Sequence, residues 1–109
     1  MINDEAVWEL TVTRDGGVAT VHAAGDLDLD TAPRLLAEVK RLLEERVEAL
    51  VVDLGGLAFV DSSGLGILVA CWRRAQAANV EFRLLNPTED VTMTLEITGL
   101  DQILPIVRA

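Results

Sequence analysis

The first part of the chain alternates between apolar and polar side chains. In residues 7–13 the apolar side chains occur at every second position and so lie on one side of an extended chain, which predicts a strand with one buried face. Residues 14–17 have the turn sequence Arg-Asp-Gly-Gly, and residues 18–24 again favour a strand. The pattern therefore predicts a β-hairpin as the first unit of the fold.

The hydrophobic period then changes from two to about 3.6, which is typical of an amphipathic helix and predicts one over residues 31–46. The apolar stripe of this helix consists of Ala32, Leu35, Leu36, Val39, Leu42 and Leu43. Asp30 or Thr31 is expected to cap its N-terminus. Pro33 falls in the first turn, where a missing N–H is tolerated.

Three further segments continue the alternation of strands and helices. Residues 50–54 are a short, almost uninterrupted apolar run, as expected for a strand covered on both faces. Residues 63–78 favour a second helix, and residues 81–85 favour another strand. Because strand–helix–strand units need a crossover connection, we expect these later strands to pair in parallel.

The last part of the chain predicts a third helix and a short edge strand. Residues 86–89 open the helix, with Asn86 as the cap and proline at the first helical position. Gly99 is expected to end it in the left-handed conformation, and residues 103–107 favour an edge strand. The predicted fold class is therefore α/β. We expect a small mixed, partly parallel sheet of four or five strands flanked by three or four helices, in one domain over residues 1–109.

The charge of the chain narrows the choice of partners. Nine Lys and Arg residues stand against eighteen Asp and Glu residues, for a formal net charge of −9. Such a surface repels phosphate groups, which argues against nucleic acid and anionic membranes as partners. A basic patch on another protein is the expected complement.

Three features point to the cytoplasm. Cys71 is the only cysteine, so no internal disulfide or Cys-x-x-Cys metal site is possible, which fits a reducing compartment. The acidic residues 1–5 do not have the character of a signal peptide. The longest apolar run of the second helix, residues 67–72, is too short to span a bilayer.

The only two serines of the chain, Ser62 and Ser63, stand side by side where the second helix is predicted to begin. Free backbone N–H groups and the helix dipole favour a negative charge at such a position. The pair is therefore the best candidate for a phosphorylation switch. The alternative is that one serine caps the helix and the other has no special role. The local sequence leaves both interpretations open.

Three alternating carboxylates, Asp26, Asp28 and Asp30, follow the second predicted strand. A calcium loop is excluded, because Thr31 and Ala37 stand where that loop needs Gly and Glu. An aspartyl-phosphate enzyme would need a phosphate clamp that no nearby basic residue supplies. We expect solvated carboxylates and helix caps here.

The remaining candidate groups have simpler interpretations. Asp53 resembles the acceptor of a phospho-aspartate receiver domain, but the only lysine, Lys40, is on the first helix and not at a late strand end. His22 is the only histidine and is expected to be a packed or half-exposed structural residue. A Ser-His-Asp triad with it is not excluded by sequence distance, although neither serine is on a Gly-x-Ser-x-Gly elbow.

Gly64 and Gly66 lie within one turn of the predicted start of the second helix. A glycine costs a helix interior about 0.5–1 kcal/mol relative to alanine, so two of them need an explanation. Either a partner approaches the backbone closely, or the helix packs tightly on the sheet.

Three sequence segments together resemble the STAS family of anti-sigma-factor antagonists. They are Gly-Asp-Leu-Asp at residues 25–28, Val-Val-Asp-Leu at residues 51–54 and Phe-Val-Asp-Ser-Ser-Gly-Leu-Gly at residues 59–66. The likeness extends from the first strand to about Pro105. The pairing of the first and third segments is more specific than either segment alone.

The resemblance implies a binding protein and not an enzyme, with no cofactor and no metal. In the family, the unphosphorylated antagonist binds an anti-sigma factor that is also an ATP-dependent serine kinase, and so releases a sigma factor. The kinase then phosphorylates the serine after the aspartate, here Ser62 with Ser63 as the fallback, and the complex dissociates. A serine phosphatase restores the free form, which is expected to be a monomer.

The resemblance also implies a docking surface around the acceptor serine. Its expected members are Asp26, Asp28, Asp61, Ser62, Ser63, Gly64 and Leu65. The backbone N–H groups of residues 63–66 are expected to be free to hold the phosphate. The alternative within the family is a non-catalytic adaptor in a sensor assembly or a lipid- or anion-transport complex, which works without a phosphorylation switch.

Overall fold

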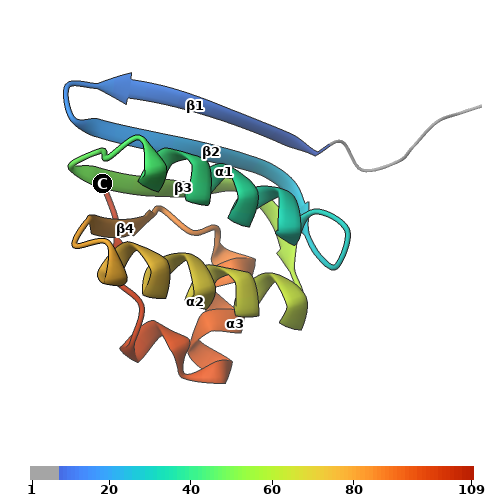
Figure 1. Ribbon diagram of the computed structural model, residues 1–109. Coiled ribbons are helices and arrows are strands. Elements are labelled where there is room, and N and C mark those ends of the chain that lie inside the picture. Colours follow the sequence, from blue (N-terminus) through green and yellow to red (C-terminus); the bar gives the residue numbers. More distant parts are fainter. Residues whose placement is uncertain (1–7) are drawn as a thin grey trace, which may run out of the picture.

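The computed structural model describes residues 8–109 and has a five-stranded sheet with the strand order β1-β2-β3-β4-β5 (Figure 1). Strands β1 (Glu9–Asp15) and β2 (Val18–Leu27) pair antiparallel, which confirms the predicted hairpin. Val7, with which the predicted first strand begins, lies outside the described residues. So do residues 1–5, on which the expectation of no signal peptide rests.

The other three strands run parallel to β2. Strand β3 (Ala49–Val60) lies between β2 and β4 (Glu81–Leu85), and β5 (Ile106–Val107) pairs with β4 at the far edge. The predicted mixed, partly parallel sheet is therefore confirmed.

Helices α1 (Ala32–Glu44) and α2 (Ser62–Ala77) lie side by side against one face of the sheet (Figure 1). Helix α3 (Glu89–Thr98) packs against β3 and leads into a short 3-10 turn, η1 (Leu100–Gln102). No helix within the described part of the chain combines the length and the apolar character needed to cross a membrane.

A single hydrophobic core joins the sheet to these helices. Four residues of the predicted apolar stripe of α1 are buried, namely Ala32, Leu35, Val39 and Leu42. Leu36 and Leu43 are half-buried and pack against the same core. Burial of each large aliphatic side chain contributes roughly 1.5–3 kcal/mol, so this stripe fixes α1 on the sheet.

Strands β2 and β3 are both longer than predicted. β2 continues to Leu27 instead of residue 24, and β3 continues to Val60 instead of residue 54. The two extensions pair with each other, with Asp26 opposite Phe59 and Leu27 opposite Val60. The sequence hides this because Gly55-Gly56 is typical of a turn, whereas pairing with β2 holds the backbone extended.

The predicted cap of α1 is confirmed in position for Thr31, but the expected side-chain hydrogen bond to the helix is not made. Thr31 is the N-cap position, but its backbone is already helical (φ −97°, ψ −27°) and its side chain caps nothing. Its hydroxyl instead donates to the Asp26 carbonyl oxygen at 2.7 Å. The carboxylate of Asp28, and not that of Asp30, accepts from the backbone in this loop, at 3.0 Å from the Asp30 nitrogen and 3.2 Å from the Thr31 nitrogen.

The predicted start of α3 is wrong by two residues. The cap is Thr88, whose hydroxyl accepts from the Val91 N–H at 3.3 Å. Asn86 instead has a positive φ of 50°, and its side-chain oxygen accepts from the Ala109 N–H at 2.8 Å. Gly99, with φ 77°, ends the helix in the left-handed conformation as predicted.

The predicted edge strand at residues 103–107 is confirmed only at its end. The Leu104 N–H bonds the carbonyl oxygen of Leu100 at 2.9 Å, which continues the compact geometry of η1. Only Ile106–Val107 forms a strand, beside β4, and the Leu84 N–H of β4 donates to the Pro105 carbonyl oxygen at 2.9 Å. Directly after β4, the Asn86 N–H donates to the Val107 carbonyl oxygen at 2.8 Å.

Candidate docking site around Ser62

Helix α2 begins with Asp61 as its cap. The Asp61 carboxylate accepts from the Gly64 N–H at 2.9 Å, and the Asp61 carbonyl oxygen accepts from the Leu65 N–H at 2.9 Å. Ser62 and Ser63 are the first two helical residues. The alternative in which a serine caps this helix is therefore wrong, because aspartate already fills that role.

The two serines differ in exposure. Ser62 is exposed to solvent, whereas Ser63 is half-buried. A kinase has to bring a hydroxyl into its own active site, so exposure favours Ser62 as the acceptor and leaves Ser63 second.

Two backbone N–H groups remain free at this helix start. A helix leaves its first four N–H groups without intrahelical acceptors. Here the Asp61 N–H donates to the Leu27 carbonyl oxygen at 3.2 Å, and the Gly64 N–H donates to the cap. Of the donors at this helix start, the N–H groups of Ser62 and Ser63 have no acceptor among residues 8–109. The expectation that all N–H groups of residues 63–66 are free is thus wrong for Gly64 and for Leu65.

The acidic loop after β2 lies directly beside this helix start. The parallel pairing of β2 and β3 sets Leu27 opposite Val60, and the Asp61–Leu27 hydrogen bond extends that contact by one residue. Asp26 and Asp28 therefore stand beside Asp61, although they are far from it in the sequence. This places the three aspartates of the predicted docking surface at the carboxyl ends of two neighbouring inner strands, β2 and β3.

Asp28 also has a structural role in this loop. Besides the two N–H groups that its carboxylate accepts from, its own N–H donates to the Thr31 hydroxyl at 2.9 Å. The expected use of these carboxylates as helix caps is not confirmed at α1, where Asp28 instead holds the loop before the helix and no side chain caps it.

Two exposed apolar side chains flank the acidic residues, and the sequence analysis missed them. Leu29, in the loop after β2, is 72% exposed, and Phe59, near the end of β3, is 51% exposed. Large apolar side chains at the centre of a polar surface are typical anchors of protein interfaces. The sequence carries a signal for Leu29, which stands between Asp28 and Asp30, but not for Phe59, whose neighbours Ala58 and Val60 are apolar.

The two glycines of α2 have different explanations. A Cβ on Gly64 would lie 2.6 Å from the Leu27 carbonyl oxygen and 2.7 Å from a Val60 methyl carbon, so tight packing explains this glycine. A Cβ on Gly66 would have nothing within 4 Å. Packing therefore does not explain Gly66, which is exposed and open to the approach of a partner.

Gly64 and Leu65, both included in the predicted docking surface, are buried in the free protein. Their side-chain positions face the core, so neither offers a surface for direct contact. What they contribute is the position of the helix start relative to β2.

His22 forms a hydrogen-bonded line across three strands on the sheet. Its Nδ1 is 2.9 Å from the Asp53 carboxylate, and its Nε2 is 2.9 Å from the Thr13 hydroxyl. The expectation of a half-exposed structural histidine is confirmed. The triad with Ser62 or Ser63 is wrong, because both ring nitrogens are already bound to other residues. These hydrogen bonds could not be predicted from the sequence, because they depend on the strand register that sets His22 opposite Asp53.

Cys71 lies on the buried side of α2. Burial raises the pKa of the Cys71 thiol to about 12, and the positive charge of Arg74 opposes this shift as the smaller cause. The thiol is therefore neutral at physiological pH. Within residues 8–109, no three His, Cys, Asp or Glu side chains come together as metal ligands.

Comparison with known proteins assigns the chain to a family. The model of the STAS domain matches residues 9–109. An anti-sigma F factor antagonist of Paenibacillus polymyxa is 30% identical over 91 residues, which cover 83% of this chain and 78% of that protein. An anti-sigma-B factor antagonist of Bacillus subtilis is 30% identical over 86 residues, or 79% of this chain and 78% of the relative. The crystal structure of an anti-sigma factor antagonist from Mycobacterium paratuberculosis superposes with a TM-score of 0.82 at 28% identity, covering 92% of this chain and 85% of that one. The chain belongs to the STAS domain family.

Proposed function

We propose that this protein is an anti-sigma factor antagonist whose docking is switched by phosphorylation of Ser62. The observation that carries the proposal is the exposed Ser62 hydroxyl beside two free N–H groups, where the carboxyl ends of β2 and β3 bring Asp26, Asp28 and Asp61 to one end of the sheet. The names of the two relatives at 30% identity support the same function.

In its unphosphorylated form the protein binds an anti-sigma factor that is also a serine kinase, and so releases the sigma factor. The carboxylates around Ser62 select a basic surface on this partner, while Leu29 and Phe59 supply apolar contacts. The protein acts by binding and not by catalysis. We propose a cytoplasmic monomer, with residues 1–109 as one domain.

Phosphorylation switches the docking off by adding charge and not by unfolding the site. A phosphoryl group carries about −1.5 to −2 charges at neutral pH. The free N–H groups of Ser62 and Ser63 and the helix dipole accommodate it within the protein. An interface that buries this charge beside Asp61 loses affinity, and a change of about 10–100-fold requires only about 1.4–2.8 kcal/mol. A serine phosphatase then restores docking.

The direct test is a pull-down with the purified chain from a native lysate, before and after phosphatase treatment of the chain. The expected result is that only the dephosphorylated chain recovers an ATP-binding kinase. With this kinase and ATP, the chain should gain one phosphate, which Ser62→Ala loses and Ser63→Ala keeps. Phosphate on Ser63 or on a threonine would move the acceptor site.

Binding of the same kinase to Ser62→Asp separates the switch from the adaptor alternative. We expect the affinity for the kinase to fall about 10–100-fold in Ser62→Asp. In Ser62→Asn, whose side chain has the size of aspartate but no charge, the affinity should stay unchanged. Equal affinity of both variants would favour a constitutive adaptor.

A further inference from the structure

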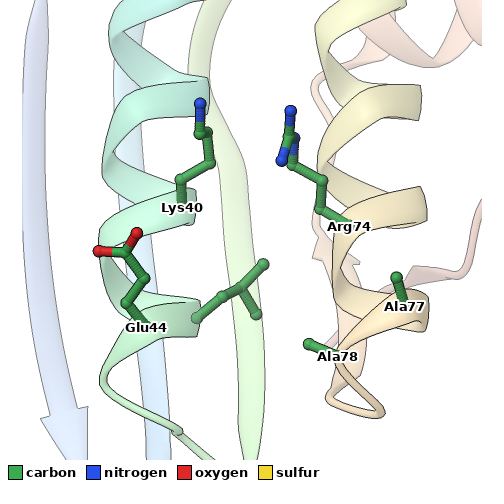
Figure 2. A pocket seen from close by; sticks show the side chains of 6 residues that line it. Lys40, Glu44, Arg74, Ala77 and Ala78 are labelled. Atoms are coloured by element: carbon green, nitrogen blue, oxygen red, sulfur yellow. The ribbon is translucent and has the colours of Figure 1, made fainter.

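A shallow groove opens between α1 and α2 at the end of the helices that lies away from Ser62 (Figure 2). Its volume is about 320 Å³, and it is lined by Lys40, Leu43, Glu44, Arg74, Ala77 and Ala78. Arg74 is twelve residues after Ser62, which corresponds to about 18 Å along α2 at 1.5 Å per residue. The groove is therefore separate from the proposed docking surface.

The two cations of this groove face each other without a counter-ion. Figure 2 shows the Lys40 ammonium, which extends along α1, and the Arg74 guanidinium, which reaches toward α1, on opposite sides of the gap, while the Glu44 carboxylate turns away from α2. Within residues 8–109, neither cation has a carboxylate oxygen within 4 Å. Arg41, directly after Lys40, pairs with both Glu38 and Glu45.

This arrangement is unusual in a chain with twice as many acidic as basic residues. Two like charges that face each other repel, and an anion between them relieves that repulsion. Lysine provides a point charge and arginine a planar pair of donors, a combination that suits an oxyanion. The geometry is thus complementary to a negative group that enters between the helices.

The surroundings of the groove favour a carboxylate over a phosphate. The net charge of −9 repels a dianion more strongly than a monoanion. The apolar part of the lining, Leu43, Ala77 and Ala78, suits the methylene stem of an acidic side chain. Because the groove is shallow and exposed, a free anion gains little there, and a ligand with further contacts is needed.

We propose that the Lys40–Arg74 groove binds an Asp or Glu side chain from an acidic segment of a protein partner. The inference does not depend on the proposed switch at Ser62. Together with the acidic surface at the other end of α2, it gives the helical layer a negative end and a positive groove. A partner of opposite polarity is thereby held in one orientation.

The test uses the only lysine of the chain as a probe. Reductive methylation with ¹³C-formaldehyde labels Lys40 and the amino terminus and keeps both positive charges. The probe peptide is acetyl-Ala-Glu-Ala-Leu-Glu-amide, with the matched peptide in which both Glu residues are Gln. The expected result is a saturable shift of the Lys40 methyl signal with the Glu peptide alone, which weakens as salt is added.

Variants of the full chain locate the site. Arg74→Gln should weaken binding of the Glu peptide by about threefold, as for one exposed ion pair. Arg73→Gln, which removes the neighbouring exposed charge outside the groove, should leave binding unchanged. Ser62→Asp should also leave it unchanged, so failure here and failure of the proposed switch are distinguishable.

Four outcomes would overturn the inference. They are equal shifts with the Glu and Gln peptides, an unchanged affinity of Arg74→Gln, and binding of inorganic phosphate as tight as that of the Glu peptide. The fourth is concentration-dependent dimerisation that Lys40→Gln abolishes, which would assign the groove to a second copy of the chain.

Discussion

Helices α1 and α2 follow the carboxyl ends of the neighbouring parallel strands β2 and β3, yet their N-termini are chemically different. At α1 the first four backbone positions offer no free donor. The Thr31 N–H donates to the Asp28 carboxylate, and the Ala32 N–H donates to the Asp28 carbonyl oxygen. The Arg34 N–H donates to the Thr31 carbonyl oxygen. Pro33 has no N–H to offer.

At α2 two of the corresponding donors are free, those of Ser62 and Ser63. Asp61 takes the Gly64 N–H and the carbonyl oxygen of Leu27 takes the Asp61 N–H. A helix N-terminus can therefore hold a phosphoryl group through its backbone only where its N–H donors remain unused. Of these two helix starts, only α2 combines free donors with an exposed hydroxyl.

The largest expected effect on stability comes from filling the space beside Gly64. Gly64→Ala places a methyl group against the Leu27 carbonyl oxygen, and such overpacking costs about 1–3 kcal/mol. Urea unfolding monitored by tryptophan fluorescence measures it. Gly66→Ala is the matched control, which should gain about 0.5–1 kcal/mol because nothing obstructs its methyl group. Equal effects of both variants would contradict the packing assigned to Gly64.

The caps of the two helices give the next effect. Asp61→Ala removes the acceptor of the Gly64 N–H and should cost about 1 kcal/mol of unfolding free energy. Asp61→Asn keeps an acceptor and should recover most of this loss. In Asp28→Ala the loop before α1 loses its acceptor, so faster amide exchange is expected at Asp30 and Thr31 and not at Gly64.

A negative charge at the open helix start should have a smaller and favourable effect on folding. Ser62→Asp is expected to stabilise the free protein by about 0.3–1 kcal/mol at low salt, because it lies at the positive end of the α2 dipole. Thermal unfolding at low and high salt measures the difference. A marked loss of stability would show that added charge disturbs the fold, and would contradict a switch that acts through docking alone.

Cys71 provides a measure of global opening that is independent of both helix starts. Its folded-state pKa of about 12 is above the ordinary value of about 8.5 in an unfolded chain. The folded form therefore keeps a proton that the unfolded form loses, so this contribution to stability is complete below pH 8.5 and falls as the pH rises toward 12. No effect is expected at neutral pH.

Two measurements check this expectation. When the pH is raised from 8 to 10, the urea midpoint of the wild type should decrease by more than that of Cys71→Ala. At pH 8 the native protein should resist iodoacetamide until urea opens the core. Rapid alkylation of the native protein would contradict the burial of this thiol.

Local patterns in the sequence were sufficient to predict most of the fold. The alternation in residues 7–13 and the stripe of α1 are properties of neighbouring residues, so a strand and a helix were predicted there, with bounds that differ by one or two residues from β1 and α1. The helix caps were harder, because Asn86 and Asp30 have the right chemistry but the backbone conformation decides which side chain reaches an N–H. This geometry makes Thr88 the cap of α3, whereas at α1 no side chain caps the helix and Asp28 accepts from the Thr31 N–H of the preceding loop.

The sequence by itself determined the hairpin, the parallel pairing, the serine pair at a helix start and the family resemblance, because each depends on residue types at short spacing. Only the tertiary structure decided that Asp61 caps α2, that Leu29 and Phe59 stand exposed beside it, and that Lys40 faces Arg74. These depend on how distant segments pack together. Strand register and helix packing set such contacts, and neither is encoded in any short stretch of the chain.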